Sequence, residues 1–393
     1  MSRQGWLNRG VAGIGTASLF SDLGHEVPTS LLPAFLTSTL GAPAAALGLI
    51  EGIADSVSGA AKLAGGAVAD DPHRRRASAI AGYTATPILV GLIGVTTAVW
   101  QVVVLRVAAW GARGFRGPSR NTLLADAAEP AAYGRAFGFE RAMDNLGAIG
   151  GPLLALALVS LTSVRAAFLL SMIPGLMAAV AVAWAIRHIP AVAREHRGIR
   201  LIVRPFLRGT MGHLLLGVTV FEIGNVAATL MILRAGDLLG GAADGGPVRA
   251  ALLLYAGYNF VATVASMAAG HLIDRANPAW VLRAGVGAFA AAYLLFASSA
   301  GIVGLGVAFA LAGLGIGFVE TGEHAAVATL APERSRGSAF GLLAGIQSFG
   351  NLVASGVAGL LWTLVSPEAA FVWIAALMVV SLAALPGARR FRA

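Results

Sequence analysis

Cysteine is absent from this sequence of 393 residues, which excludes disulfide bonds and thiolate metal sites. Charged residues are also scarce: they make up 12% of the chain, whereas roughly a quarter of an ordinary soluble protein is charged. The sequence contains no glycine-rich phosphate loop with lysine, no GxSxG motif and no HExxH motif, which are signatures of several enzyme classes. These absences argue against a soluble protein and against an enzyme, whether soluble or intramembrane.

Apolar residues dominate the composition instead, at 57% of the chain with a mean hydropathy of +0.77. A helix needs about 20 apolar residues to cross a bilayer, and the apolar runs predict an all-α integral membrane protein with twelve spanning helices. The first run is too long for a removable signal peptide, so we expect it to be retained. The predicted spans are 11–37, 44–69, 77–97, 99–122, 134–160, 164–186, 208–235, 248–272, 280–298, 301–330, 337–363 and 367–386.

The formal charge of +9 is distributed along the chain as membrane topology requires, and it does not indicate nucleic-acid binding. Arginines crowd alternate connections between the predicted spans. Because short basic loops stay on the cytoplasmic side, both termini are expected in the cytoplasm, which requires an even number of spans. The crowded connections carry Arg3 and Arg9; Arg74, Arg75 and Arg76; Arg116, Arg120 and Arg135; Arg187, Arg194, Arg197, Arg200, Arg204 and Arg208; Arg275; Arg334 and Arg336; and Arg389, Arg390 and Arg392.

A glycine and proline motif lies in the fifth predicted span. Residues 138–152 read GFERAMDNLGAIGGP, in which Gly138, Gly147, Gly151 and Pro152 form the pattern GxxxxxxxxGxxxGP. Gly147 and Gly151 are one helical turn apart, so a partner backbone can approach their shared face, and Pro152 predicts a bend. Such small-residue stripes also occur at ordinary membrane helix interfaces. The motif resembles the fifth-helix motif of proton-coupled antiporters in the major facilitator superfamily, although the usual closing glycine pair is absent.

An internal repeat divides the chain. Asp70 recurs as Asp274 after 204 residues, and Asp22 recurs as Glu222 after 200. Gly134, Phe137, Gly138 and Gly147 recur after 203 residues as Gly337, Phe340, Gly341 and Gly350. The superfamily resemblance implies two six-helix halves related as parallel repeats, with the substrate path at their interface. We place these halves at 1–186 and 208–393, joined by a basic linker at 187–207 on the cytoplasmic leaflet.

The turn after the second span carries a further resemblance to the superfamily. Gly66 and Asp70 end this span before a basic turn, and Gly270, Asp274 and Arg275 do the same in the second half. The resemblance implies that such an aspartate pairs with a neighbouring arginine or helix N-terminus and latches the outward-facing state. The alternative is a solvated turn that only fixes topology.

Ionisable residues at membrane depth are the best guide to chemistry, because each costs a few kcal/mol there unless it is paired or hydrated. Asp22, His25 and Glu26 stand at i, i+3 and i+4 in the first span and therefore share a face. Glu51 and Asp55 share a face of the second span. We expect these five side chains to bind protons or substrate.

Further ionisable groups lie in the later spans. Arg106, in the fourth span, resembles the lone arginine that superfamily members use near the proton site. Glu140, Arg141 and Asp144 lie at shallower depth in the fifth span and are interpreted as a structural charge cluster. The second half contributes to the predicted site Glu222, Asn225, Glu320, Glu323 and His324.

The sequence thus predicts a proton-coupled secondary transporter that exports a small solute across an inner membrane by alternating access. Asp22, Glu26 and Glu51 would carry the proton, with Arg106 tuning their affinity for it. We expect a monomer in the lipid bilayer, with no cofactor and no nucleic-acid partner. A non-transporting receptor or scaffold is less favoured. The main alternative is an exporter of a divalent metal ion or metal chelate, whose ligands would be Asp22, His25, Glu26, Glu320, Glu323 and His324.

Overall fold

The structure is a computed structural model that describes residues 5–190, 199–239, 246–298 and 301–387. The described residues form helices joined by short turns, with no strand among them. Each predicted span is matched by one helix or by two consecutive helices whose ends differ from the prediction by a few residues. The all-α membrane fold is therefore confirmed. The middle of the predicted linker, 191–198, and the basic chain ends, 1–4 and 388–393, lie outside the described residues.

The helices cluster into two compact units. Unit 1 comprises Met1–Val203 with Ala331–Gly345, and unit 2 comprises Arg204–Leu330 with Ile346–Ala393. The boundary after Val203 falls inside the predicted linker, whereas the boundary after Gly345 falls inside a helix that the sequence repeat assigns to the second half. Packing of residues 331–345 against the first unit therefore cuts across the order of the repeat.

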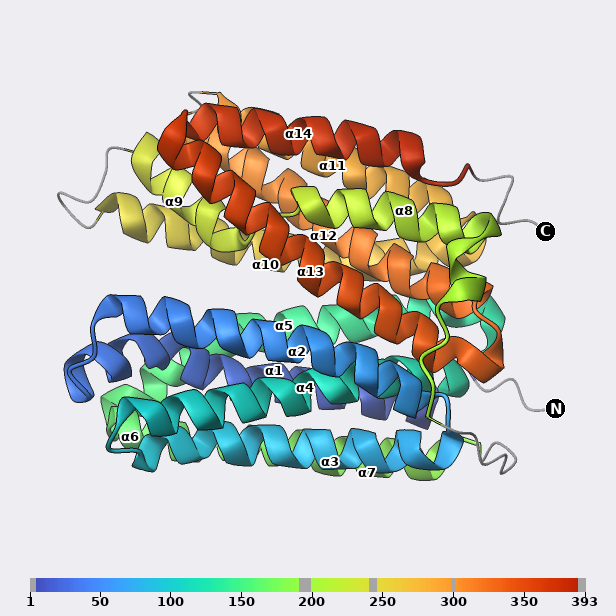
Figure 1. The fold of residues 1–393 in the computed structure, drawn as a ribbon, viewed down its shortest axis with the longest axis horizontal. Coiled ribbons are helices and arrows are strands. Elements are labelled where there is room, and N and C mark those ends of the chain that lie inside the picture. Colours follow the sequence, from blue (N-terminus) through green and yellow to red (C-terminus); the bar gives the residue numbers. More distant parts are fainter. Residues whose placement is uncertain (1–4, 191–198, 240–245, 299–300, 388–393) are drawn as a thin grey trace. The chain divides into compact units, whose positions relative to one another are not determined.

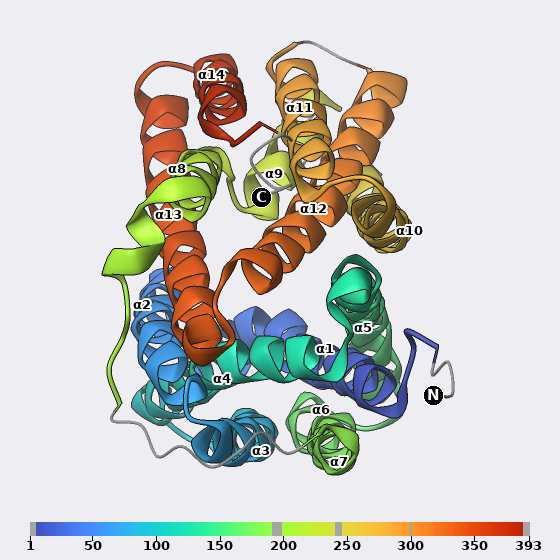
Figure 2. The same cartoon turned by 90° about the vertical axis from the view of Figure 1, so that its right-hand side faces the viewer.

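Unit 1 contains the first seven α-helices of the chain. In it α1 packs against α5 and α7, α2 packs against α4, and α3 packs against both α4 and α7 (Figures 1 and 2). Short polar caps begin several of these helices: the Asn8 side chain accepts a hydrogen bond from the Val11 amide, and Asp71 caps α3 with Pro72 at the first position, a favourable place for proline. The helices are α1 (Arg9–Ala34), α2 (Ala44–Ala69), α3 (Pro72–Gly91), α4 (Val99–Ala127), α5 (Tyr133–Leu161), α6 (Val164–Leu170) and α7 (Met172–His188).

Unit 2 repeats much of this packing with the later helices. In it α11 and α12 pack as α3 and α4 do, α10 and α12 as α2 and α4 do, α11 and α14 as α3 and α7 do, and α8 and α14 as α1 and α7 do. The helices are α8 (Gly209–Gly224), α9 (Ala228–Leu238), α10 (Gly246–Arg275), α11 (Pro278–Ala297), α12 (Ile302–Leu330), α13 (Arg336–Leu364), whose residues up to Gly345 belong to unit 1, and α14 (Pro367–Ala384).

Three helices of unit 1 differ from the others in composition. Within the described residues, nine helical segments are long and apolar enough to cross a membrane. Helices α1, α2 and α4 are long enough, at 26, 26 and 29 residues, but they are not among the nine. These are the helices on which the sequence places the proton-binding candidates of the first half. The helices of unit 1 that fall short of the apolar composition of a spanning helix are therefore the ones that carry the predicted site.

Candidate functional site

Three acidic and imidazole side chains of α1 form one cluster in unit 1. His25 Nδ1 lies 3.5 Å from Asp22 Oδ1, and His25 Nε2 lies 3.3 Å from Glu26 Oε1. The imidazole thus lies between the two carboxylates, as the i, i+3, i+4 spacing requires. Asp22 also accepts a hydrogen bond from Arg113 Nη2 of α4 at 3.0 Å. Asp22 and His25 are nearly buried, whereas Glu26 keeps about a quarter of its side chain exposed.

The glycines of the α5 motif lie directly against this cluster. A Cβ atom on Gly147 would lie 2.5 Å from the Leu19 carbonyl oxygen and 2.9 Å from Asp22 Cβ. A Cβ atom on Gly151 would collide with Glu26. The missing side chains therefore allow α5 to approach the acidic face of α1. Pro152 lies inside α5, which continues through it, and Gly138 is buried in the same helix.

A second cluster joins α2 and α4. Arg106 donates from Nε to Glu51 Oε1 and from Nη2 to Glu51 Oε2, each at 3.0 Å. The Arg106 guanidinium also lies 3.3 Å from the centre of the Trp110 ring, and Trp110 Nε1 donates to Asp55 Oδ1 at 3.0 Å. Two-point binding and stacking fix the orientation of a guanidinium in a way that lysine cannot reproduce. The sequence-predicted residues Glu51, Asp55 and Arg106 are thus brought together, with Trp110 between them.

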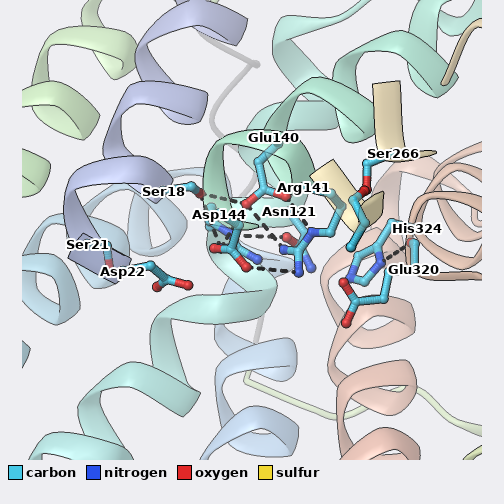
Figure 3. Close-up of polar contacts among 12 residues, drawn as sticks. Ser18, Ser21, Asp22, Asn121, Glu140, Arg141, Asp144, Ser266, Glu320 and His324 are labelled. Carbon is cyan, nitrogen blue, oxygen red and sulfur yellow. Dashed lines mark hydrogen bonds and ion pairs between the residues drawn. The ribbon is translucent and has the colours of Figure 1, made fainter. Parts of the chain in front are cut away.

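A buried ion network lies at the α1, α4 and α5 contact (Figure 3). Glu140, which is fully buried, accepts from Ser18 Oγ at 2.6 Å and pairs with Arg120 Nη1 at 2.9 Å and Arg141 Nε at 2.8 Å. Asp144 lies 3.4 Å from Arg141 Nη1 and 3.6 Å from Arg120 Nη1. Two carboxylates and two guanidinium groups therefore balance one another, which is the arrangement that buried charges require.

The structure corrects the placement of Arg116 and Arg120, which the sequence counted among the basic connections. Both lie within α4 and are largely buried. Arg116 Nη2 donates to Ser21 Oγ at 2.6 Å, and its guanidinium lies 3.7 Å from the centre of the Tyr83 ring. The partners on neighbouring helices hold these arginines in the interior, so they are not free to act as loop charges.

Two residues of the site were missed by sequence reasoning. Arg113 binds Asp22, and Trp110 contacts both Arg106 and Asp55. A signal was available, because Arg106, Trp110 and Arg113 stand at i, i+4 and i+7 and therefore share one face of α4. Trp110 also lies edge-on to the His25 ring, with the centroids 5.6 Å apart. The α4 face thus connects the α1 and α2 clusters.

In unit 2, the predicted residues form two smaller groups. Glu222, at the end of α8, accepts from Asn225 Nδ2 at 3.1 Å, and Gly350 of α13 lies directly against Glu222. This contact repeats the packing of Gly147 on Asp22. On α12, His324 Nδ1 donates to the Glu320 carbonyl oxygen at 2.7 Å (Figure 3).

Glu323, on the same helix, is fully buried, and its Oε2 accepts from Gln347 Nε2 at 2.8 Å. The three predicted α12 side chains thus have different neighbours. His324 bonds within its own helix, whereas Glu323 is fixed by an amide from α13.

The predicted latch residue Asp70 lies in the turn between α2 and α3 and binds the N-terminus of α13. Asp70 Oδ1 accepts from the Ser338 amide at 3.0 Å, and Asp70 Oδ2 accepts from Ser338 Oγ. The first amides of a helix lack intrahelical partners and attract negative charge, so Asp70 caps α13 from the turn between α2 and α3. Burial raises the pKa of the Asp70 carboxyl above its ordinary value, although the hydrogen bonds from Ser338 and Gly337 act in the opposite direction.

Close backbone contact accompanies this cap. A Cβ atom on Gly66 would lie 2.7 Å from Gly341 Cα, so neither glycine can be enlarged without moving a helix. The second copy of the motif, Gly270, Asp274 and Arg275, ends α10, with Gly270 buried, Asp274 half-buried and Arg275 exposed.

A metal centre would require several of these acidic and imidazole side chains to converge on one point. Within the described residues, no three His, Asp or Glu side chains are grouped so that they could hold a metal ion. Asp22 and Glu26 flank His25, but the Asp22 carboxylate is already paired with Arg113. The site chemistry that these residues support is exchange of protons and of hydrogen-bonded or charged partners among carboxylates, imidazole and guanidinium groups.

Comparisons with known sequences identify one family. The chain matches the family model described as Major Facilitator Superfamily at residues 14–240 and 214–391. An uncharacterized protein of Mycobacterium tuberculosis is 33% identical over 184 residues, which is 46% of this chain and 45% of that protein. The chain therefore matches less than half the length of that relative. An uncharacterized MFS-type transporter of Methanocaldococcus jannaschii is 24% identical over 377 residues, which is 95% of this chain and 94% of that protein.

Solved structures show the same fold at low sequence identity. A bacterial homologue of the iron transporter ferroportin, in an outward-facing state, has a TM-score of 0.77 and 15% identity, covering 96% of this chain and 98% of that one. The Escherichia coli fucose:proton symporter FucP has a TM-score of 0.71 and 15% identity, covering 98% of each chain.

Proposed function

This chain belongs to the Major Facilitator Superfamily, and from that membership we propose that it is a proton-coupled secondary transporter that exports a small solute by alternating access. It is a multi-pass membrane transporter and not an enzyme. The observation that carries the coupling proposal is the α1 face, where Asp22 is bound to Arg113 and shares His25 with Glu26.

The proposed coupling uses competition for one carboxylate. A proton on Asp22 removes the negative charge that binds Arg113, and it leaves the guanidinium available for another acceptor. Glu26, which keeps solvent access, is suited to deliver or receive that proton through His25. Because the ion pair and the protonated acid differ in charge, a substrate that contacts this face distinguishes the two states.

The glycine contacts supply the mechanical part of the proposal. Gly147 and Gly151 bring α5 against Asp22 and Glu26, so a change in charge on α1 acts directly on the fit of α5. Interfaces packed this closely change between discrete arrangements. We propose that the Asp70 cap on α13 stabilises one of the two end states and opens in the other.

Topology and partners follow from the same proposal. Both termini and the basic linker are proposed to lie on the cytoplasmic side of an inner membrane, because the arginine-rich connections are expected there. Protons and a small solute are the proposed partners, and the transporter is proposed to act as a monomer. The fucose:proton symporter is a precedent for proton coupling on this fold.

A metal-ion exporter remains the second candidate, because His25 lies within 3.5 Å of one carboxylate and 3.3 Å of another. The similarity to a homologue of an iron transporter extends only to the fold. Against this candidate, Arg113 competes with any cation for Asp22, and the described residues lack a three-ligand group.

The proposal is tested with the purified protein in liposomes that enclose a pH-sensitive dye. Drugs, sugars, organic anions and divalent metals are added in turn, and proton movement and solute movement are recorded together. We expect one solute class to move protons in the opposite direction, and an imposed pH gradient to drive that solute uphill. Solute transport that neither moves protons nor responds to the gradient would reject proton coupling.

A further inference from the structure

Glu323 differs from the other deep carboxyl groups in what surrounds it. The residue is fully buried in α12. One carboxyl oxygen, Oε2, accepts from Gln347 Nε2 at 2.8 Å, whereas Oε1 is buried without a hydrogen-bond partner among the described residues. Among the described residues, the neighbour that binds the carboxyl is thus a neutral amide.

The buried and half-buried carboxylates of the unit 1 clusters are compensated by cations. Asp22 is paired with Arg113, Glu51 with Arg106, and Glu140 with two arginines. No such ion pair to Glu323 occurs in the part of the chain that the structure describes. An isolated carboxylate in the membrane interior costs several kcal/mol, so an uncompensated acid at this position is stable only when it is neutral.

The groups around Glu323 do not supply a compensating charge. On α12 itself, Glu320 and His324 are the neighbouring ionisable residues, and His324 Nδ1 is engaged with the Glu320 carbonyl. From α8, Glu222 is near enough to interact electrostatically with Glu323, and it is also acidic. The helices packed against α12 also carry Tyr258 of α10 and Tyr293 of α11, and three cationic side chains that form no ion pair with Glu323 among the described residues. Arg283 of α11 donates to the Leu385 carbonyl oxygen, and His271 and Arg275 of α10 are exposed.

We infer that Glu323 carries an exchangeable proton, and that unit 2 therefore has a proton-binding site of its own, with Gln347 as the positioning residue. The Gln347 amide donates to Oε2, which acts as the carbonyl oxygen of the neutral acid, and this leaves Oε1 to carry the proton. Release converts the acid to a carboxylate and passes the proton to water. Only the use of this proton in coupling rests on the proposed function, because the protonation itself follows from burial and hydrogen bonding.

Infrared spectroscopy of the purified full chain tests this inference directly, because a neutral carboxyl has a carbonyl band that an ionised carboxylate lacks. We expect a carboxylic acid band at neutral pH that disappears in Glu323→Gln and that decreases as the pH is raised. The matched control is Glu368→Gln, which neutralises an exposed carboxylate paired with Arg234 and should leave the band unchanged. A band that persists in Glu323→Gln, or that is constant until the protein unfolds, overturns the inference.

A second variant keeps the test decisive if Glu323→Gln does not fold. Gln347→Leu removes the donor to Oε2, so the acid band should move to higher frequency while the other bands stay in place. An unchanged band overturns the inference. Liposome measurements separate the two proposals. If the acid band titrates but no solute drives proton movement, only the proposed function is rejected. If solute transport is coupled to protons but the band is missing, only the Glu323 site is rejected.

Discussion

Arg113 donates to Asp22 through Nη2 at 3.0 Å, while its Nη1 is buried without a hydrogen-bond partner among the described residues. Asp22 is thus the partner that the structure provides for this guanidinium. Removing the carboxylate charge leaves the cation uncompensated, and the cost lies between about 1 kcal/mol for an exposed pair and about 3–5 kcal/mol for a buried one.

We therefore predict that Asp22→Asn lowers the melting temperature and that adding Arg113→Gln recovers most of the loss. Thermal unfolding of the detergent-purified variants measures both changes. Glu26→Gln is the control, because among the described residues the Glu26 carboxylate contacts His25 and no arginine, and this variant should be destabilised less. A double variant that is no more stable than Asp22→Asn contradicts the assigned pairing.

In transport, both Asp22→Asn and Glu26→Gln should abolish uphill movement of the substrate while substrate exchange continues.

Enlarging Gly147 should block turnover. A Cβ atom there would lie 2.5 Å from the Leu19 carbonyl oxygen, so even alanine forces α1 and α5 apart, and leucine adds an overpacking cost of about 1–3 kcal/mol or more. Transport rates in liposomes should fall in the order wild type, Gly147→Ala, Gly147→Leu, with binding affected less than turnover. Gly359→Ala is the control, since no atom lies within 4 Å of its added Cβ. Equal transport rates in all four proteins would show that the close contact at Gly147 plays no part in transport.

The stability of the folded protein should depend on pH through Asp70. Because burial raises the pKa of Asp70 in the folded state, its contribution to stability is fully present below the unfolded pKa and is lost as the pH rises through the folded pKa. The Asp70→Asn side chain cannot ionise. The melting temperature of this variant relative to wild type should therefore increase as the pH is raised from the unfolded pKa of Asp70 through its folded pKa. The comparison requires melting curves of both proteins across acid and neutral pH. A difference that is constant with pH, or that falls, contradicts the raised pKa.

Lysine should not replace Arg106. The substitution loses one of two hydrogen bonds to Glu51 and the stacking on Trp110, which together are worth about 2 kcal/mol. Arg106→Lys should therefore lower both the melting temperature and the transport rate. Arg74→Lys changes an exposed arginine that lies 3.8 Å from Asp71, and it should shift stability by less than about 0.5 kcal/mol. Similar effects of the two substitutions would show that the Arg106 geometry is unimportant.

Metal binding separates the two candidate functions. We predict that manganese, iron, cobalt or nickel at micromolar concentration leaves the melting temperature unchanged, and that His25→Gln combined with His324→Gln weakens transport several-fold without abolishing it. A ligand at about 100 times its dissociation constant stabilises a protein by about 2.7 kcal/mol, which a melting curve detects. A metal-dependent rise that the double variant loses would favour the metal exporter.

Local spacing predicted much of the first-half site. The positions of Asp22, His25 and Glu26 follow from helix geometry, and the structure brings them together. The same geometry predicts that Gly147 and Gly151 share a face. The residues they meet could not be predicted, because that contact joins α5 to α1 across more than a hundred residues of chain, and neither periodicity nor spacing specifies which helices become neighbours.

Charge counting was the less reliable guide. Arg116 and Arg120 contribute to the basic pattern that predicts topology, but inside the fold they are held by Ser21 and Glu140. Composition cannot distinguish an arginine in a loop from one neutralised on a helix face. Spacing places Arg113 on the same face of α4 as Arg106 and Trp110, but spacing does not indicate that its partner is Asp22 of α1.

The charged character of α4 has a consequence for how the protein is made. An arginine at the centre of an isolated spanning helix costs about 2.5–3.5 kcal/mol on insertion, and α4 carries several buried ones whose acceptors lie on helices synthesised before and after it. Glu51 and Asp22 leave the ribosome ahead of α4, whereas Glu140 follows it. The partners that offset the cost of the α4 arginines are therefore complete only when α1, α2 and α5 have all been synthesised, so α4 depends for its place in the membrane on helices made both before and after it.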